Sequence, residues 1–300
     1  MVIFSLPKNQ KNVKPLFKKI SQIGLVLGCV VGLSLVAEKA TANFTIARIT
    51  TNLPFHPEWE VQSIDKQELA SIEGIVKQKF LFLDNGGQSW VFISQDGQYV
   101  VKFFKFRFTW YDLFKNLSLP HFLEPYRPQL TSKQLAKRNR LLGGYAIAYQ
   151  KMREETLLKG IFLNGKHEGL TTMHIIDKIG VSHHIDLHDK PFIIQRTAVP
   201  LVTHLTPLMK EGRIQEAQDA LCSALNLIAE RCAHGIIDED HRLFCNLGFV
   251  GKQAVYLDAG SLKEDPSIAL PERARNEILR SADLLIKQLD QEANIHVPPY

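Results

Sequence analysis

Three side chains able to bind a divalent cation follow one another in the last quarter of the chain: Asp240, Asn246 and Asp258. An apolar segment precedes each of them, and Gly248 and Gly260 mark turns after the last two. Carboxylate and amide oxygens are hard ligands, and Mg²⁺ usually binds one or two carboxylates together with substrate phosphates. The stretch therefore predicts a Mg²⁺ site, although an acidic surface turn followed by a strand and a β-turn fits the same residues.

These ligands need elements that hold them at one point. Residues 213–233 place apolar side chains at helical spacing and predict a helix that ends directly before His234. Residues 249–257 predict a hairpin, because two apolar runs flank a glycine-containing turn. Such a hairpin would bring Asn246 and Asp258 to the same ion although they lie twelve positions apart in the chain.

A second group of candidate residues lies upstream, where residues 79–104 alternate in the manner of three short strands joined by turns. Gly86 and Gly87 occupy the first of these turns, and Lys102 lies on the third strand. The alternative for Lys102 is a solvent-facing lysine at the end of a strand.

Residues 131–158 predict a helix with an apolar stripe that ends at Glu155. Gly143 and Gly144 are expected to break or kink this helix. A carboxylate at the end of an apolar stripe points toward the core, where an unpaired charge is costly, so Glu155 needs a partner. A frayed glutamate at the surface is the alternative.

The sequence HGIIDED at positions 234–240, followed by Asn246 and by YLDAG, resembles the catalytic core of the protein-kinase-like superfamily. The family's pattern is H-R-D, an asparagine shortly after it, and a D-F-G triplet. The resemblance implies that Asp240 is the catalytic aspartate and that Asn246 and Asp258 bind Mg²⁺. It also implies a two-lobed α+β fold that binds ATP.

This chain departs from the family pattern at three points. Asp238 and Glu239 stand where the family has His-Arg, and Ala259 stands where it has Phe. Asn246 follows Asp240 by six positions, where the family has five.

The same resemblance implies roles for the upstream residues. Lys102 would pair with the ATP phosphates, and Glu155 would hold that lysine, with Glu154 left open as the alternative. Gly86 and Gly87 fall where a glycine-rich loop would cover the phosphates, although the full G-x-G-x-x-G-x-V pattern is not present. We therefore expect Lys102, Glu155 and Asp258 to converge on one cleft.

The N-terminal segment carries five lysines and then eighteen uncharged residues, 20–37. That length is just sufficient for a transmembrane helix, and the lysines predict a single-pass protein with a cytoplasmic N-terminus. Ala40-Thr41-Ala42 also fits a signal-peptidase site, so export after cleavage near Ala42 is an open alternative. Both interpretations place the remainder of the chain outside the cytoplasm.

Charge is distributed unevenly along the chain. Six of the 36 Lys and Arg residues and one of the 31 Asp and Glu residues precede Asn43, so residues 43–300 carry 30 of each sign. A nucleic-acid partner is therefore not expected, because it would need basic charge clustered on the folded domain.

A stretch rich in possible metal ligands contains His183, His184, Asp186 and His188. It fits either a transition-metal site or a strand with one solvent-exposed face.

The preferred prediction is a kinase-like phosphotransferase that moves a phosphoryl group from ATP-Mg²⁺ to an unidentified hydroxyl acceptor. The alternatives are an inactive pseudokinase that acts as a membrane-anchored or exported binding module, and an unrelated membrane-anchored interaction domain. Forty residues follow Gly260, so the expected C-lobe is reduced. The predicted divisions are a basic tail (1–19), a transmembrane or signal segment (20–37), a linker (43–77), an N-lobe (78–198) and a helical C-lobe (199–300).

Overall fold

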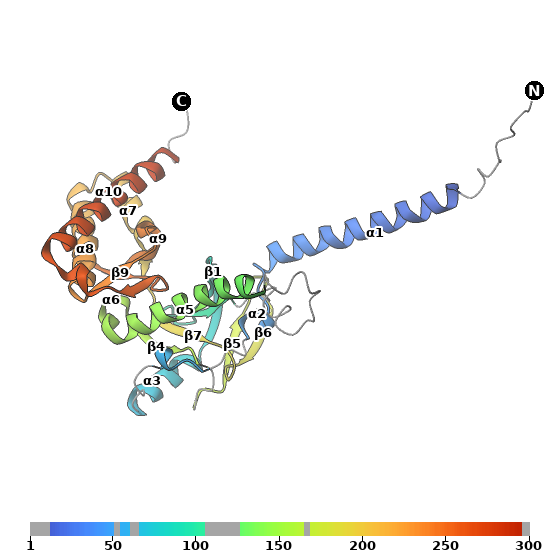
Figure 1. Cartoon of the computed structure of the whole chain (residues 1–300), viewed down its shortest axis with the longest axis horizontal. Coiled ribbons are helices and arrows are strands. Elements are labelled where there is room, and N and C mark those ends of the chain that lie inside the picture. Colours follow the sequence, from blue (N-terminus) through green and yellow to red (C-terminus); the bar gives the residue numbers. More distant parts are fainter. Residues whose placement is uncertain (1–12, 51–54, 61–65, 106–126, 165–168, 296–300) are drawn as a thin grey trace, which may run out of the picture.

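The computed structural model describes residues 13–50, 55–60, 66–105, 127–164 and 169–295, and of residues 13–21, 23, 26, 127–134 and 290–295 it describes the backbone alone. The protein is α+β: a mixed β-sheet dominates the first lobe and helices dominate the second (Figure 1).

The sheet of the first lobe has seven strands in the order β4-β7-β3-β2-β1-β5-β6. Neighbouring strands are antiparallel except β1 and β5, which run parallel. The three strands predicted over residues 79–104 are confirmed, and the strands β4 and β5 were not predicted. The bounds are β1 (Lys79–Asn85), β2 (Ser89–Ser94), β3 (Tyr99–Phe104), β4 (Leu158–Phe162), β5 (Thr172–Ile176), β6 (Ser182–Asp186) and β7 (Phe192–Arg196).

Aromatic side chains fill the core of this lobe. Every second residue of β2 is buried, so Trp90 and Phe92 face the same side and meet Phe103 of β3. Part of the predicted linker belongs to this core, because Phe44 contacts both Trp90 and Phe92 edge-on, and Ile49 is fully buried. The described parts of residues 43–77, which were predicted as a linker, contain α2 (Ile46–Ile49), η1 (Pro57–Trp59) and α3 (Lys66–Val76).

The N-terminal segment forms the long helix α1 (Val13–Ala40), which extends away from the body of the protein (Figure 1). Within the described part of the chain, no helix is long and apolar enough to cross a membrane. The side chains of four residues of the predicted span lie outside that part: Ile20, Ser21, Ile23 and Val26.

The helix predicted over residues 131–158 has different ends in the structure. Helix α5 (Arg127–Lys151) begins earlier and stops sooner, and a separate short helix, α6 (Arg153–Thr156), follows it. Leu157 adopts a left-handed conformation (φ 53°), which ends α6 and turns the chain into β4. Gly143 and Gly144 do not break α5, because both lie inside a continuous helix.

The second lobe is built around α8 (Ile214–Ala233), the helix predicted before His234. The hairpin predicted over residues 249–257 is confirmed as β10 and β11, which pair in antiparallel register. The other elements of this lobe are β8 (Val199–Pro200), α7 (Leu201–Lys210), β9 (Ile236–Asp238), α9 (Leu243–Asn246), β10 (Leu247–Val250), β11 (Gln253–Tyr256), β12 (Leu262–Glu264), η3 (Pro266–Ala269) and α10 (Pro271–Ile295).

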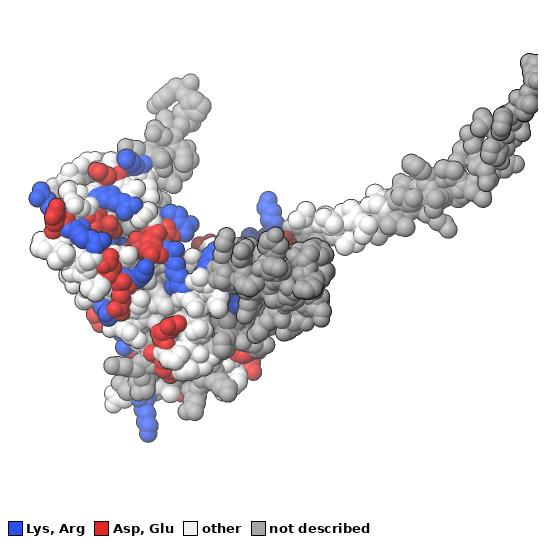
Figure 2. All heavy atoms as spheres, viewed as in Figure 1, with Lys and Arg blue, Asp and Glu red and all other residues white. Residues whose placement is uncertain are grey.

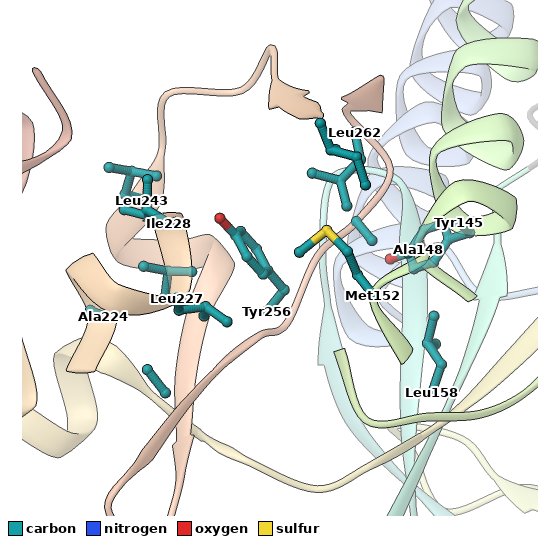
Figure 3. Packing of buried hydrophobic residues seen from close by; sticks show 14 of the residues in the cluster. Tyr145, Ala148, Met152, Leu158, Ala224, Leu227, Ile228, Leu243, Tyr256 and Leu262 are labelled. Carbon is teal, nitrogen blue, oxygen red and sulfur yellow. The ribbon is translucent and has the colours of Figure 1, made fainter. Parts of the chain in front are cut away.

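One hydrophobic core runs from α5 across to the second lobe. Met152, directly after α5, lies between Tyr145 and Tyr256 of β11 (Figure 3). The buried Gln195 of β7 adds a polar link, because its amide donates to the carbonyl oxygens of Thr156 (2.7 Å) and Tyr256 (2.8 Å). On the face shown in Figure 2, basic and acidic side chains are interspersed over the second lobe.

Candidate functional site

Lys102 and Asp258 meet where the two lobes join. Lys102 is buried on β3, and its ammonium donates a hydrogen bond to the carbonyl oxygen of Leu257, the residue before Asp258. Burial lowers the pKa of Lys102, and the nearby Asp258 carboxylate opposes that shift. The structure thus brings together two of the three residues that were expected to converge.

Asp258 is oriented by two hydrogen bonds to the same carboxylate oxygen, Oδ1. The hydroxyl of Tyr145 donates one (3.1 Å), and the backbone N–H of Gly260 donates the other (2.9 Å). Burial, together with the Asp258 carboxylate, raises the pKa of Tyr145 well above its ordinary value. Sequence reasoning missed this role for Tyr145. The available signal was a tyrosine inside the apolar stripe of a helix, since a buried tyrosine hydroxyl usually finds a partner.

Asn246 is held beside Asp258 through the backbone. Its carbonyl oxygen accepts hydrogen bonds from the N–H groups of Leu257 (2.7 Å) and Asp258 (3.4 Å), at the open end of the β10–β11 hairpin. The Asn246 side chain is buried, and its amide lies close enough to the Asp240 carboxylate to help lower the pKa of that group. Amide and carboxylate oxygens are hard donors, the ligand type that Mg²⁺ takes in proteins.

Asp240 is engaged by an arginine that the sequence did not single out. Arg242 donates from Nε to Oδ1 (3.1 Å) and from Nη2 to Oδ2 (2.7 Å) of Asp240. These bonds lower the pKa of Asp240 to about 2, and the neighbouring Asn246 amide contributes. Arg242 also lies within the electrostatic reach of Asp258, which helps to raise the pKa of the guanidinium.

The two acidic residues that replace the family's His-Arg have partners of their own. Asp238 is buried at the end of β9, and its Oδ1 accepts from the Ser261 hydroxyl (2.6 Å) and from the backbone N–H of Asp240 (2.9 Å). Glu239 pairs with Arg140 of α5 (3.0 Å) and with Lys263 of β12 (3.7 Å). The two acidic residues at these positions are therefore bound by basic and polar groups of other segments of the chain.

The predicted pair between Lys102 and Glu155 is not formed. The Glu155 carboxylate pairs with Nε2 of His234 at 2.9 Å, and Glu154 is exposed. The reason is that α5 ends at Lys151, so Glu155 lies on α6 and is directed toward the end of α8. The residue of α5 that reaches the site is Tyr145.

Two close approaches fix α5 against the turn after Asp258. A Cβ atom built at Gly144 would lie 2.4 Å from the carbonyl oxygen of Ala259, and one built at Gly260 would lie 2.3 Å from Leu141. The Ala259 carbonyl belongs to the backbone and cannot move aside, so glycine at position 144 is what lets α5 pack directly on the turn. The atom that faces Gly260 is Cδ1 at the end of the Leu141 side chain, which can rotate away.

The turn with Gly86 and Gly87 joins β1 and β2, and the Gly86 carbonyl oxygen accepts from the Lys105 ammonium. Gln88, the residue after Gly87, lies close to Gly260. A Cβ atom built at Gly260 would lie 3.1 Å from Oε1 of Gln88. The β1–β2 turn therefore lies next to the segment that carries Asp258.

The histidine-rich stretch is engaged in local contacts. His183 pairs with Asp177 at 2.8 Å, and the His184 ring stacks on His174 with 4.5 Å between centroids. Of the residues that the structure describes, no three or more His, Cys, Asp or Glu side chains are grouped to hold a metal ion. The strand interpretation of this stretch is confirmed as β6.

No protein-family model and no curated protein matches the chain. Among solved structures, the chain is similar to two of WbdD, a bifunctional kinase-methyltransferase, at 17% identity and TM-scores of 0.33 and 0.32. These matches cover 68% and 66% of this chain but 37% and 34% of WbdD, so the chain spans about a third of that protein. A complex of Rv3197 from Mycobacterium tuberculosis with erythromycin matches at 14% identity and a TM-score of 0.28, over 87% of this chain and 68% of Rv3197. Similarities this weak do not define a family, and the proposals below rest on the geometry of the chain itself.

Proposed function

We propose that the protein is a kinase-like phosphotransferase that moves a phosphoryl group from ATP-Mg²⁺ to a hydroxyl acceptor. The observation that carries the proposal is the meeting of Lys102, from the sheet, with Asp258 and Asn246, from the hairpin of the other lobe. Phosphoryl transfer needs positioning and neutralisation of negative charge more than covalent chemistry from the protein. A buried ammonium beside a hard-oxygen cation site would supply both.

Each residue has a distinct part in this proposal. Lys102 would pair with phosphate oxygens, while Asn246 and Asp258 would hold Mg²⁺, which neutralises charge on the phosphates when it is bound. Asp240 would orient the acceptor hydroxyl. Its pKa of about 2 favours that orienting role over a role as a strong general base.

A second candidate is a nucleotide-binding pseudokinase that performs no turnover. Two observations favour it: Glu155 does not pair with Lys102, and Arg242 occupies both carboxylate oxygens of Asp240. Under this alternative Asp240 would be a structural partner of Arg242, and binding of ATP would not require it.

The two candidates are separated by measuring binding and turnover on the same full-length protein. With Mg-ATP at about 100 times its Kd, binding adds roughly 2.7 kcal/mol to the free energy of unfolding and raises Tm by about 5–10 °C. We expect Lys102→Ala and Asp258→Asn to abolish this rise and Glu155→Gln to retain it. The absence of a rise in the wild type at millimolar Mg-ATP would contradict both candidates.

Turnover is then followed by the release of ADP. The phosphotransferase proposal expects release that falls at least 100-fold in Asp240→Asn while the Tm rise persists. Equal ADP release by the wild type and Asp240→Asn would favour the pseudokinase.

A further inference from the structure

A buried ion pair lies behind the loop that carries Asp240. Arg231, in the last turn of α8, is fully buried, and its Nη1 lies 3.8 Å from Oδ2 of the buried Asp238. This is an ion pair without a hydrogen bond, because neither atom has a hydrogen-bond partner among the described residues. Its Nη2 donates to Glu277 of α10 at 2.6 Å. Burying charged groups is costly unless they are paired, so removal of either partner would leave an uncompensated charge in the protein interior.

Asp238 uses its two oxygens for different purposes. Oδ2 faces Arg231, whereas Oδ1 accepts from the backbone N–H of Asp240 and from the hydroxyl of Ser261. Asp240 lies in the candidate catalytic loop, and Ser261 directly follows the turn that carries Asp258. A single oxygen atom therefore joins the two segments whose spacing sets the site.

The backbone around Asp238 strengthens this junction. Asp238 is the last residue of β9 and pairs with Leu262 of β12, and the N–H of Glu239 donates to the carbonyl oxygen of Ser261 (3.2 Å). The two-stranded β9–β12 ladder is short, so side-chain bonds at its end have a large share in holding the register.

We propose that Asp238 is a positioning residue that fixes the Asp240 loop to the turn after Asp258 through Oδ1, and that buried Arg231 holds this carboxylate in place. In its effect on catalysis, the inference rests on the proposed phosphoryl transfer. In its effect on loop order, it stands independently of any activity.

Two charge-balanced double variants of the full-length protein separate the parts of this proposal. Arg231→Met with Asp238→Asn removes both charges but keeps an oxygen acceptor for Asp240 and Ser261. Arg231→Met with Asp238→Ala removes the same charges and also the acceptor. Asp238→Asn alone leaves the buried guanidinium without its facing carboxylate, and we expect it to lower Tm by roughly 10 °C. Both double variants also remove the Arg231 partner of Glu277, so the informative comparison is between the Asn and Ala double variants.

The decisive readout is hydrogen exchange at the backbone amides of Asp240 and its neighbours, since the Asp240 N–H is one of the groups bound. We expect exchange at these amides to be on the order of 10 times faster in the Ala double variant than in the Asn double variant. This ratio corresponds to a loss of about 1.4 kcal/mol in the free energy of local opening. Where turnover is present, kcat should fall on the order of 100-fold in the Ala double variant, while KM for Mg-ATP changes little.

Equal exchange at Asp240 in the two double variants would overturn the positioning role, whatever the activity. If exchange at Asp240 differs between the two double variants but the wild-type protein shows no turnover, the positioning role is retained and the phosphotransferase proposal is refuted. Ser261→Ala supplies a second test within the intact ion pair. It removes one of the two donors to Oδ1, and unchanged exchange on both sides of the junction would also count against the proposal.

Discussion

The charged residues of the site have hydrogen-bond or ion-pair partners that come from other residues of the chain. Lys102 is buried and yet faces a carbonyl oxygen and the Asp258 carboxylate, so its charge has partners in the folded protein. Tyr145 and Gly260 share one oxygen of Asp258. Arg242, which is 68% exposed, binds Asp240 at the edge of the site, so this contact can be exchanged for a substrate group at small cost.

Removal of that arginine changes the titration of Asp240. The folded-state pKa of about 2 lies below the ordinary 3.8, so the Arg242 pair stabilises the fold above pH 4 and is lost as the pH falls toward 2. We expect Arg242→Gln to raise the pKa of Asp240 toward 3.8, as followed by carboxylate NMR. The stability change should stay below about 1 kcal/mol, because the arginine is exposed and the pair is screened.

Arg213→Gln is the matched control, because Arg213 pairs with Glu211 and Glu216 and should leave Asp240 unaffected. An Asp240 that still titrates near pH 2 after Arg242→Gln would show that another group lowers its pKa.

At the scale of elements, helix α5 is the part that connects the sheet to the site. It carries Tyr145 to Asp258 and Arg140 to Glu239, and its Gly144 lets it lie directly on the turn after Asp258. The helix thus contributes a hydroxyl to the site and a cation to the candidate catalytic loop, whereas the expected glutamate lies on α6.

The two adjacent glycines of α5 should respond oppositely to alanine. A Cβ atom at Gly143 meets nothing within 4 Å, so Gly143→Ala should stabilise the protein by about 0.5–1 kcal/mol through helix propensity. Gly144→Ala should destabilise it by about 1–3 kcal/mol, because the new Cβ atom would overlap the Ala259 carbonyl oxygen.

Denaturant unfolding measures both changes, and each variant is the control for the other. A stabilising Gly144→Ala would mean that α5 does not rest on this turn.

At the scale of the whole molecule, the chain between α1 and the sheet is part of the folded body. Ala42 is buried, and its carbonyl oxygen accepts from the indole N–H of Trp90 at 2.9 Å. Phe44 then enters the aromatic core of the first lobe. Cleavage near Ala42, one of the alternatives drawn from the sequence, would therefore meet a buried peptide bond in the folded protein and would have to precede folding.

Truncating Phe44 tests this assignment. Phe44 is 5% exposed and packs on Trp90 and Phe92, so Phe44→Ala should lower the free energy of unfolding by about 3 kcal/mol. Phe55→Ala is the control, because Phe55 is 63% exposed and its loss should change stability by less than about 0.5 kcal/mol. Equal losses of stability in Phe44→Ala and Phe55→Ala, measured by urea unfolding, would show that residues 43–50 are not part of the folded core.

Sequence patterns are sufficient to predict the local elements and the order of the candidate ligands along the chain. Periodicity identified α8, the β10–β11 hairpin and the strands β1, β2 and β3, because their apolar patterns are strong and their turns carry glycine. Spacing alone also placed Asn246 and Asp258 at the open end of one hairpin.

The contacts between side chains from different elements depend on how those elements pack. Helix α5 ends where Met152 leaves the helical conformation (φ -138°, ψ 40°), a break that apolar spacing does not reveal. Because of this break Glu155 lies on α6 and pairs with His234 and not with Lys102. The sequence does not reveal the buried contact of Arg231 with Asp238, since an arginine on a helix and an acidic loop are ordinarily exposed to solvent. Partners across lobes are set by packing, whereas sequence patterns report only the burial of each element.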